Sequence, residues 1–173
     1  NLRDFERFIR ACAARSGQLL DKVSLAKDVG ISPTTCNEWI SVMQASNQIA
    51  LLEPWFGNFS KRLIKSPKLY LCDSGLLCFL LNISASSLTE SPFIGAIWET
   101  LAFAEIRKAC AFARDPHTIW MYRDAQHAEI DFLVQSRSRT QAIECKWAEI
   151  PTQRDAYAIE ELIEYLRKKP NRW

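Results

Sequence analysis

The sequence has 173 residues, of which 48% are hydrophobic and 24% charged, with nine Phe and six Trp. This composition excludes an intrinsically disordered chain and suffices for one good hydrophobic core or two small ones. The formal net charge of +2 excludes a strong global field for nucleic acid, so any such affinity must come from local clusters of charge.

Three features indicate the kind of protein to expect. The six cysteines contain no C-x-x-C spacing, which favours buried, reduced thiols over disulfides or zinc ligands. The sequence begins with Asn1 and has no signal peptide and no apolar run of the roughly 18 residues that a spanning helix needs. We therefore expect a fragment of a longer cytoplasmic chain without membrane contact. No G-x-x-x-x-G-K-[ST] loop occurs, which excludes a nucleotide site of that type.

The first elements in chain order are three helices. Residues 4–15 have the i, i+3, i+4, i+7 spacing of apolar side chains that is typical of an amphipathic helix. A second helix over 24–29 is expected to begin at Ser24 as N-cap and to end at Gly30, and a third is expected to begin after Ser32. Two short helices joined by "GIS" are typical of a helix-turn-helix.

Two strands are expected next, in "QIALLEPW" (48–55) and "KRLIKSPKLYLCD" (61–73), around a Gly57-Asn58 turn. They would complete a winged helix. The third helix contains no Lys or Arg, which makes readout of bases unfavourable. The second strand carries four basic residues that could contact phosphates without reading sequence: Lys61, Arg62, Lys65 and Lys68. The alternatives are a solvated basic edge and a scaffold for protein contact.

A boundary is expected at "NISASSLTESP" (82–92), because Ser, Thr, Asn and Pro are typical of surface loops. It divides the sequence into a winged helix-turn-helix domain (1–82) and a second domain (83–173). After it, 93–113 predicts a long helix with Glu99 in the middle of its apolar stripe. A carboxylate there is costly unless a cation meets it.

Three strands (118–123, 129–135 and 141–147) and a final helix (153–169) complete the expected elements. If the loop "SRSR" closes a symmetric hairpin, the numbers of paired residues sum to 275. This register places Asp131 opposite Glu144. Glu129 would then form an ion pair with Lys146, and the other face would be apolar, with Ile130, Phe132, Val134, Ile143, Cys145 and Trp147.

Asp131 and Glu144 are like charges that would destabilise a sheet unless a proton or a cation lies between them. Together with Glu99 they predict an oxygen-ligand site for Mg²⁺ or Mn²⁺, in which Glu99 acts through water. Lys146 would orient a metal-activated water or stabilise charge that develops on a phosphate.

The same residues resemble the PD-(D/E)XK restriction-endonuclease-like fold, with an αβββα core. The resemblance is carried by Glu99, by Asp131 in "EIDF", and by Glu144 and Lys146 in "IECK"; Ile130 stands where the motif has Pro. It implies that the acidic pair binds the metal and that Lys146 lies at the scissile phosphate.

Nearly the whole sequence resembles the C-terminal region of bacterial and archaeal AAA+ ATPases of unassigned function, where a winged helix leads into that nuclease-like fold. The matching segments are "KRLIKSPKLYLCDSGLL" (61–77), "IWE" (97–99), "YR" (122–123), "EIDFLV" (129–134) and "IECK" (143–146). The resemblance implies an N-terminal AAA+ ATPase domain of the same parent chain as a partner.

Three functions follow as hypotheses. The leading one is an α+β accessory part of an AAA+ ATPase with a Mg²⁺-dependent nuclease-like site that acts on nucleic acid. The alternative is a non-catalytic module that binds a protein partner or DNA for the ATPase. A DNA-binding regulator is the third, which the lack of Lys and Arg in the third helix disfavours.

Overall fold

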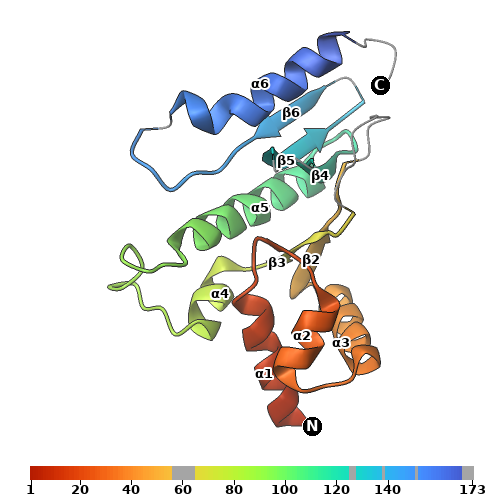
Figure 1. Cartoon of the computed structure of the whole chain (residues 1–173), viewed down its shortest axis with the longest axis vertical. Helices are drawn as coiled ribbons and strands as arrows, with labels where there is room; N and C mark the ends of the chain where they lie inside the picture. Colours follow the sequence, from red (N-terminus) through yellow and green to blue (C-terminus); the bar gives the residue numbers. More distant parts are fainter. Residues whose placement is uncertain (56–64, 125–127, 138, 151, 169–173) are drawn as a thin grey trace.

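The computed structural model describes residues 1–55, 65–124, 128–137, 139–150 and 152–168 (Figure 1). Within these ranges the chain is mixed α+β, with six helices and two small antiparallel sheets of three strands. In chain order the elements are α1 (Leu2–Ala13), β1 (Gln18–Leu19), α2 (Lys22–Val29), α3 (Pro33–Ala45), β2 (Ile49–Leu52), β3 (Lys68–Leu71), α4 (Ser74–Leu80), α5 (Ile94–Phe112), β4 (Thr118–Arg123), β5 (Glu129–Gln135), β6 (Thr140–Ile143) and α6 (Gln153–Lys168). We call α1 to α4 the first half and α5 to α6 the second half.

The ends of α2 and α3 follow from local capping. Gly30 ends α2 in the left-handed conformation (φ 80°), and the Ser32 hydroxyl accepts a hydrogen bond from Thr35 N at 3.0 Å, as the sequence predicts. The predicted start of α2 at Ser24 is wrong. Asp21 is the N-cap, and its carboxylate accepts hydrogen bonds from the amides of Val23 and Ser24. A carboxylate at this position accepts hydrogen bonds from helical N–H groups that have no other partner. Its negative charge is also stabilised by the positive end of the helix dipole.

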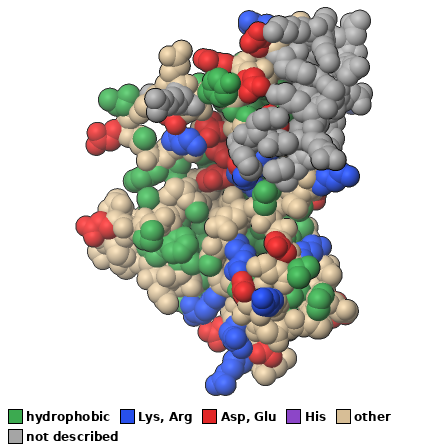
Figure 2. Space-filling view, viewed as in Figure 1, with side chains coloured by type: hydrophobic (Ala, Val, Ile, Leu, Met, Phe, Trp, Pro, Cys, Tyr) green, Lys and Arg blue, Asp and Glu red, His purple; other side chains and the backbone are tan. Residues whose placement is uncertain are grey.

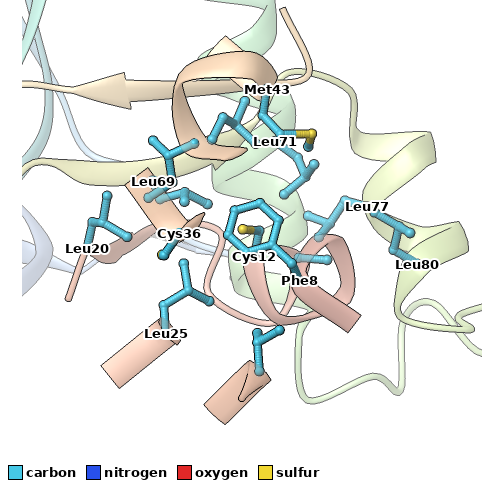
Figure 3. Close-up of a cluster of buried hydrophobic side chains, with 14 of the residues drawn as sticks. Phe8, Cys12, Leu20, Leu25, Cys36, Met43, Leu69, Leu71, Leu77 and Leu80 are labelled. Atoms are coloured by element: carbon cyan, nitrogen blue, oxygen red, sulfur yellow. The ribbon is translucent and has the colours of Figure 1, made fainter. Parts of the chain in front are cut away.

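The first half packs around a hydrophobic core (Figure 3). Phe8 and Cys12 on α1 meet Leu25 on α2, and all three are fully buried. Phe8 also packs edge-on against Trp39 of α3, with ring centroids 5.4 Å apart. The amphipathic faces that the sequence predicts for the helices therefore meet in one core.

The first sheet has the order β1-β3-β2, and β4 lies beside an extension of β2. The amide of Trp55 donates to the carbonyl of Met121 at 2.7 Å, and the amide of Met121 donates to Glu53 at 3.0 Å. The Gly57-Asn58 turn, Lys61 and Arg62 lie outside the described residues. Helix α4, capped by Asp73, was not predicted, because its seven residues form an apolar run too short to show helical periodicity.

The second sheet has the order β4-β5-β6 and lies between α5 and α6 (Figure 1). The predicted hairpin register is confirmed, since Phe132 pairs with Ile143 and Val134 with Gln141. The predicted end of β6 at residue 147 is wrong, because the strand ends at Ile143. Beyond it, the amide of Cys145 donates to the side-chain carboxylate of Asp131 at 2.9 Å instead of to a backbone carbonyl of β5.

A bulge in the β4–β5 pair changes which residues of β5 share a face. Trp120 pairs with Leu133 and Tyr122 with Ile130, so Met121 lies opposite two residues, Asp131 and Phe132. Ile130 therefore packs with Leu133 and Leu162 below α6, whereas Phe132 stacks on Phe103 of α5. The predicted common face of Ile130 and Phe132 is wrong for this reason. Trp147 is also not in the core, because it is half exposed, with its ring against Trp98.

The two halves share a small core. Tyr70 of β3 stacks on Phe103 of α5, with centroids 4.3 Å apart, and Leu52, Met121 and Phe132 belong to the same cluster. No described helix combines the length and apolarity that crossing a membrane requires.

Candidate functional site

A pocket of about 520 Å³ opens between the first sheet, α5 and the second sheet. Its lining combines four carboxylates with three cationic side chains, so the side chains carry a net charge near −1. On the face shown in Figure 2, acidic and basic side chains adjoin in the upper part of the molecule. The lining residues are Gly17, Gln18, Leu19, Lys68, Glu99, Arg123, Glu129, Asp131, Glu144 and Lys146.

Lys68 lies at the centre of the charges. Its side chain is 4% exposed, and Nζ lies 2.9 Å from Glu99, 2.5 Å from Glu129 and 3.2 Å from Asp131. Burial alone would lower the pKa of this ammonium, but the attraction of the three carboxylates outweighs burial and raises the pKa. Lys68 is therefore a buried cation, which corrects its assignment to a surface that contacts phosphates. Lys65, by contrast, is exposed.

Glu99 is held by two donors from β3. Its Oε1 accepts hydrogen bonds from Lys68 Nζ and from the hydroxyl of Tyr70. Burial raises the pKa of Glu99, and Lys68 opposes this shift. The expectation that a cation must meet a carboxylate on this apolar stripe is thus fulfilled by Lys68. Gly17 lies beside this carboxylate. Its φ of 79° favours glycine, whereas a Cβ there would make only an ordinary contact of 3.5 Å with Glu99 Oε2.

Asp131 and Glu144 lie together, as the hairpin register predicts. The amide of Asp131 donates to Glu144 Oε2 at 3.4 Å. The expected repulsion is relieved because each carboxylate has its own cation: Lys68 for Asp131, and Lys146 for Glu144 at 2.6 Å. Burial raises the pKa of Glu144, and the hydrogen bond from Lys146 opposes that rise. The same hydrogen bond raises the pKa of Lys146.

The predicted ion pair of Glu129 with Lys146 is not the one that forms. Glu129 contacts Lys68 and, at 3.2 Å, Arg123 of β4. Strand β6 ends before Lys146, so Lys146 lies outside the sheet. Its ammonium donates a hydrogen bond to Glu144 Oε1.

The oxygen donors suit a hard divalent cation, since Mg²⁺ and Mn²⁺ prefer carboxylates. In the described part of the chain, however, no three Asp, Glu, His or Cys side chains are arranged to hold a metal ion. Lys68 lies among Glu99, Glu129 and Asp131, and Tyr70 also engages Glu99. Glu99 is thus engaged by Lys68 and Tyr70, whereas Asp131 and Glu144 contact each other through the Asp131 amide.

Lys68, Tyr70 and Arg123 are the site residues that sequence reasoning missed or misassigned. Lys68 and Tyr70 are two positions apart on one strand and therefore share a face. The available signal was the apolar surroundings of Lys68 in "PKLYL", which favour burial over a solvated edge.

The fold and the site describe a mixed α+β chain whose two halves enclose a charged pocket. Residues 1–87 match a family described as domain of unknown function (DUF8612), and residues 94–172 match domain of unknown function (DUF4143). Because the first match covers half of the sequence, the chain belongs to the DUF8612 family.

Two curated relatives are similar to the chain. An uncharacterized protein of Mycobacterium bovis and one of Mycobacterium tuberculosis are each 31% identical over 137 residues. The matched region is 79% of this chain and 30% of each relative, so the chain corresponds to less than a third of their length. No solved structure matches the chain.

Proposed function

We propose that the pocket binds a divalent cation and cleaves phosphodiester bonds of nucleic acid. One observation carries this proposal: Asp131, Glu144 and Lys146 line the same pocket and are joined by hydrogen bonds. Two acids and one amine at a single point combine oxygen ligands with a charge that suits a phosphate.

Each residue has a distinct role in the proposal. Asp131 and Glu144 would hold Mg²⁺ or Mn²⁺, which would supply Lewis acidity and a water of lowered pKa. Lys146 is 45% exposed at its side chain and is the more accessible member of its pair with Glu144. Its ammonium would neutralise charge on the reacting phosphate. Glu99 would act indirectly, because its hydrogen bonds keep Lys68 and Tyr70 in place.

The order of elements supports finer proposals about the fold. Helices α2 and α3, followed by β2 and β3, have the order expected of a winged helix. Helix α5, the β4-β5-β6 meander and α6 have the order of the αβββα core that the sequence resembles. With Lys68 buried, phosphate contacts by the first half are proposed only for Lys61, Arg62 and Lys65.

The parent protein would be an AAA+ ATPase, with this chain as its accessory part. The chain spans 30% of the length of its curated relatives, which leaves ample room for a further domain. This assignment otherwise rests on the resemblance stated above.

A non-catalytic interaction module is the second candidate. The observation that favours it is that Glu99, Glu129, Asp131 and Glu144 all have internal cationic partners. A set of carboxylates neutralised in this way can hold the two halves together without binding a metal.

Single-turnover cleavage of labelled single- and double-stranded DNA and RNA in Mn²⁺ separates the two candidates. We expect cleavage by the wild type and a loss of about 100-fold or more in rate for Lys146→Met. The matched control is Lys108→Met, which removes an exposed lysine that pairs only with the exposed Glu105 in the described contacts. A wild type that cleaves none of these substrates, also within the parent protein and with ATP, would contradict the proposal and favour the module.

A further inference from the structure

Lys68 has the surroundings that a bound cation would have. Three carboxylate oxygens, from Glu99 on α5 and from Glu129 and Asp131 on β5, lie within 3.2 Å of its Nζ. Its side chain is almost completely shielded from solvent. Oxygen ligands surround metal ions in the same manner, but here an ammonium is central.

We propose that Lys68 is the built-in counter-cation of the pocket and that it competes with a divalent cation for Asp131. The inference rests on the proposed function in one respect, because Asp131 is also the proposed metal ligand. Its contact with Lys68 is the longest of the three, and its other oxygen accepts a hydrogen bond from Cys145 N. Asp131 is thus the carboxylate that Lys68 can release most easily, and two cations sharing it would repel each other.

The competition makes the affinity of the second half for a cation depend on the first half. Lys68 is the first residue of β3, and it pairs with Leu19 of β1 on one side and Leu52 of β2 on the other. The sheet of the first half therefore sets the position of the ammonium. With β3 docked against α5 and β5, the pocket holds its own cation and its affinity for a divalent cation is weakened.

A purely structural ion pair would show the same contacts but a different response to metal. If Lys68 only joins the halves, its loss weakens the fold and no divalent cation compensates. If Lys68 is a counter-cation, its loss leaves three carboxylates without a central charge, and a divalent cation can replace it.

The test is Lys68→Met in the full chain, freed of metal with a chelator and then titrated with Mn²⁺. We expect it to melt below the wild type in chelator and to be stabilised by Mn²⁺ more than the wild type. Calorimetry should show binding at least about tenfold tighter than in the wild type, because the lost repulsion exceeds the ~1.4 kcal/mol of a tenfold change. Lys108→Met, with the same loss of charge on the surface, should behave as the wild type.

The double variant Lys68→Met/Asp131→Asn provides a second test in case Lys68→Met alone does not fold. It removes one anion with the cation, so in chelator it should melt above Lys68→Met, and Mn²⁺ should not stabilise it further. Should Lys68→Met be unfolded in chelator, Mn²⁺ should restore its fold.

The proposal is overturned if Mn²⁺ stabilises or refolds Lys68→Met no better than it stabilises the wild type, or if the double variant is no more stable than the single one. These readouts involve no cleavage. A wild type inactive on nucleic acid would thus sink the proposed function alone, and an active wild type with an unresponsive Lys68→Met would sink this inference alone.

Discussion

Two buried regions of the molecule are stabilised by opposite means: the core of the first half and the contact between the two halves. The core between α1, α2 and α3 is a cluster of hydrophobic side chains, with Phe8, Cys12 and Leu25 fully buried. The region between β3, α5 and β5 instead buries one lysine among three carboxylates. Burial of apolar surface stabilises without direction, whereas a buried ion group is stable only when every charge is met. The first region should therefore tolerate changes of ions and pH, and the second should respond to both.

The largest expected effect lies in the apolar core. Phe8→Ala should lower the free energy of unfolding by about 3–5 kcal/mol, because it removes a fully buried ring and leaves a cavity. Urea denaturation at low and high salt measures the effect. Since no charge is involved, the loss should be the same at both salt concentrations, and a salt-dependent loss would break the comparison.

Asp131→Asn should have the next largest effect. If Asp131 and Glu144 only repelled each other, removing this charge would stabilise the protein without metal. The structure predicts the reverse, because Asp131 contacts Lys68 and accepts a hydrogen bond from Cys145 N. The expected loss is about 1.5–3 kcal/mol, as for a hydrogen bond to a charged group. Thermal unfolding in chelator measures this loss, with Glu105→Gln at an exposed position as the control. A melting temperature of Asp131→Asn above that of the wild type would instead indicate repulsion between Asp131 and Glu144.

The capping of α2 gives a smaller effect, away from both cores. Asp21→Ala should cost about 0.5–2 kcal/mol, because two amides at the start of the helix lose their acceptor. Ser24→Ala should stay within about 0.5 kcal/mol of the wild type, since Ser24 lies inside the helix. Equal losses for the two variants would contradict the assignment of Asp21 as N-cap.

The smallest expected effect is a pH dependence of Glu144. Burial raises the pKa of this carboxyl in the folded state, so the folded protein binds its proton more tightly than the unfolded chain. Its contribution to stability is therefore present at acidic pH and is lost as the pH rises through the raised pKa. Relative to the wild type, Glu144→Gln should gain stability as the pH rises above ~4, the ordinary range of a glutamate. Urea midpoints across this range test the sign, and a relative loss would contradict it.

Local signals were sufficient for much of the fold. Strands β4 and β5, helix α5, the end of α2 and the start of α3 follow from periodicity, Gly30 and Ser32. The proximity of Asp131 to Glu144 also follows, because a short hairpin loop sets the register. The two residues are not a strand pair, since β6 ends at Ile143 and Asp131 N donates to the Glu144 side chain instead.

The missing parts depend on contacts between distant segments. A bulge opposite Met121 separates Ile130 from Phe132, and period-two alternation contains no sign of it. The position of Lys68 depends on how β3 packs against α5 and β5. Its partners Glu99 and Asp131 are 31 and 63 residues further along the chain. The apolar neighbours of Lys68 in "PKLYL" could have indicated burial, but only the tertiary structure shows which carboxylates surround it.

Calorimetric titration of the metal-free wild type with Mn²⁺ tests the central claim most directly, namely that Asp131 and Glu144 form a site for a divalent cation. We expect saturable binding of one ion at millimolar Mn²⁺, lost in Asp131→Asn and in Glu144→Gln and retained in Glu105→Gln. The absence of any binding heat at millimolar Mn²⁺, or the same binding in all four proteins, would contradict the claim.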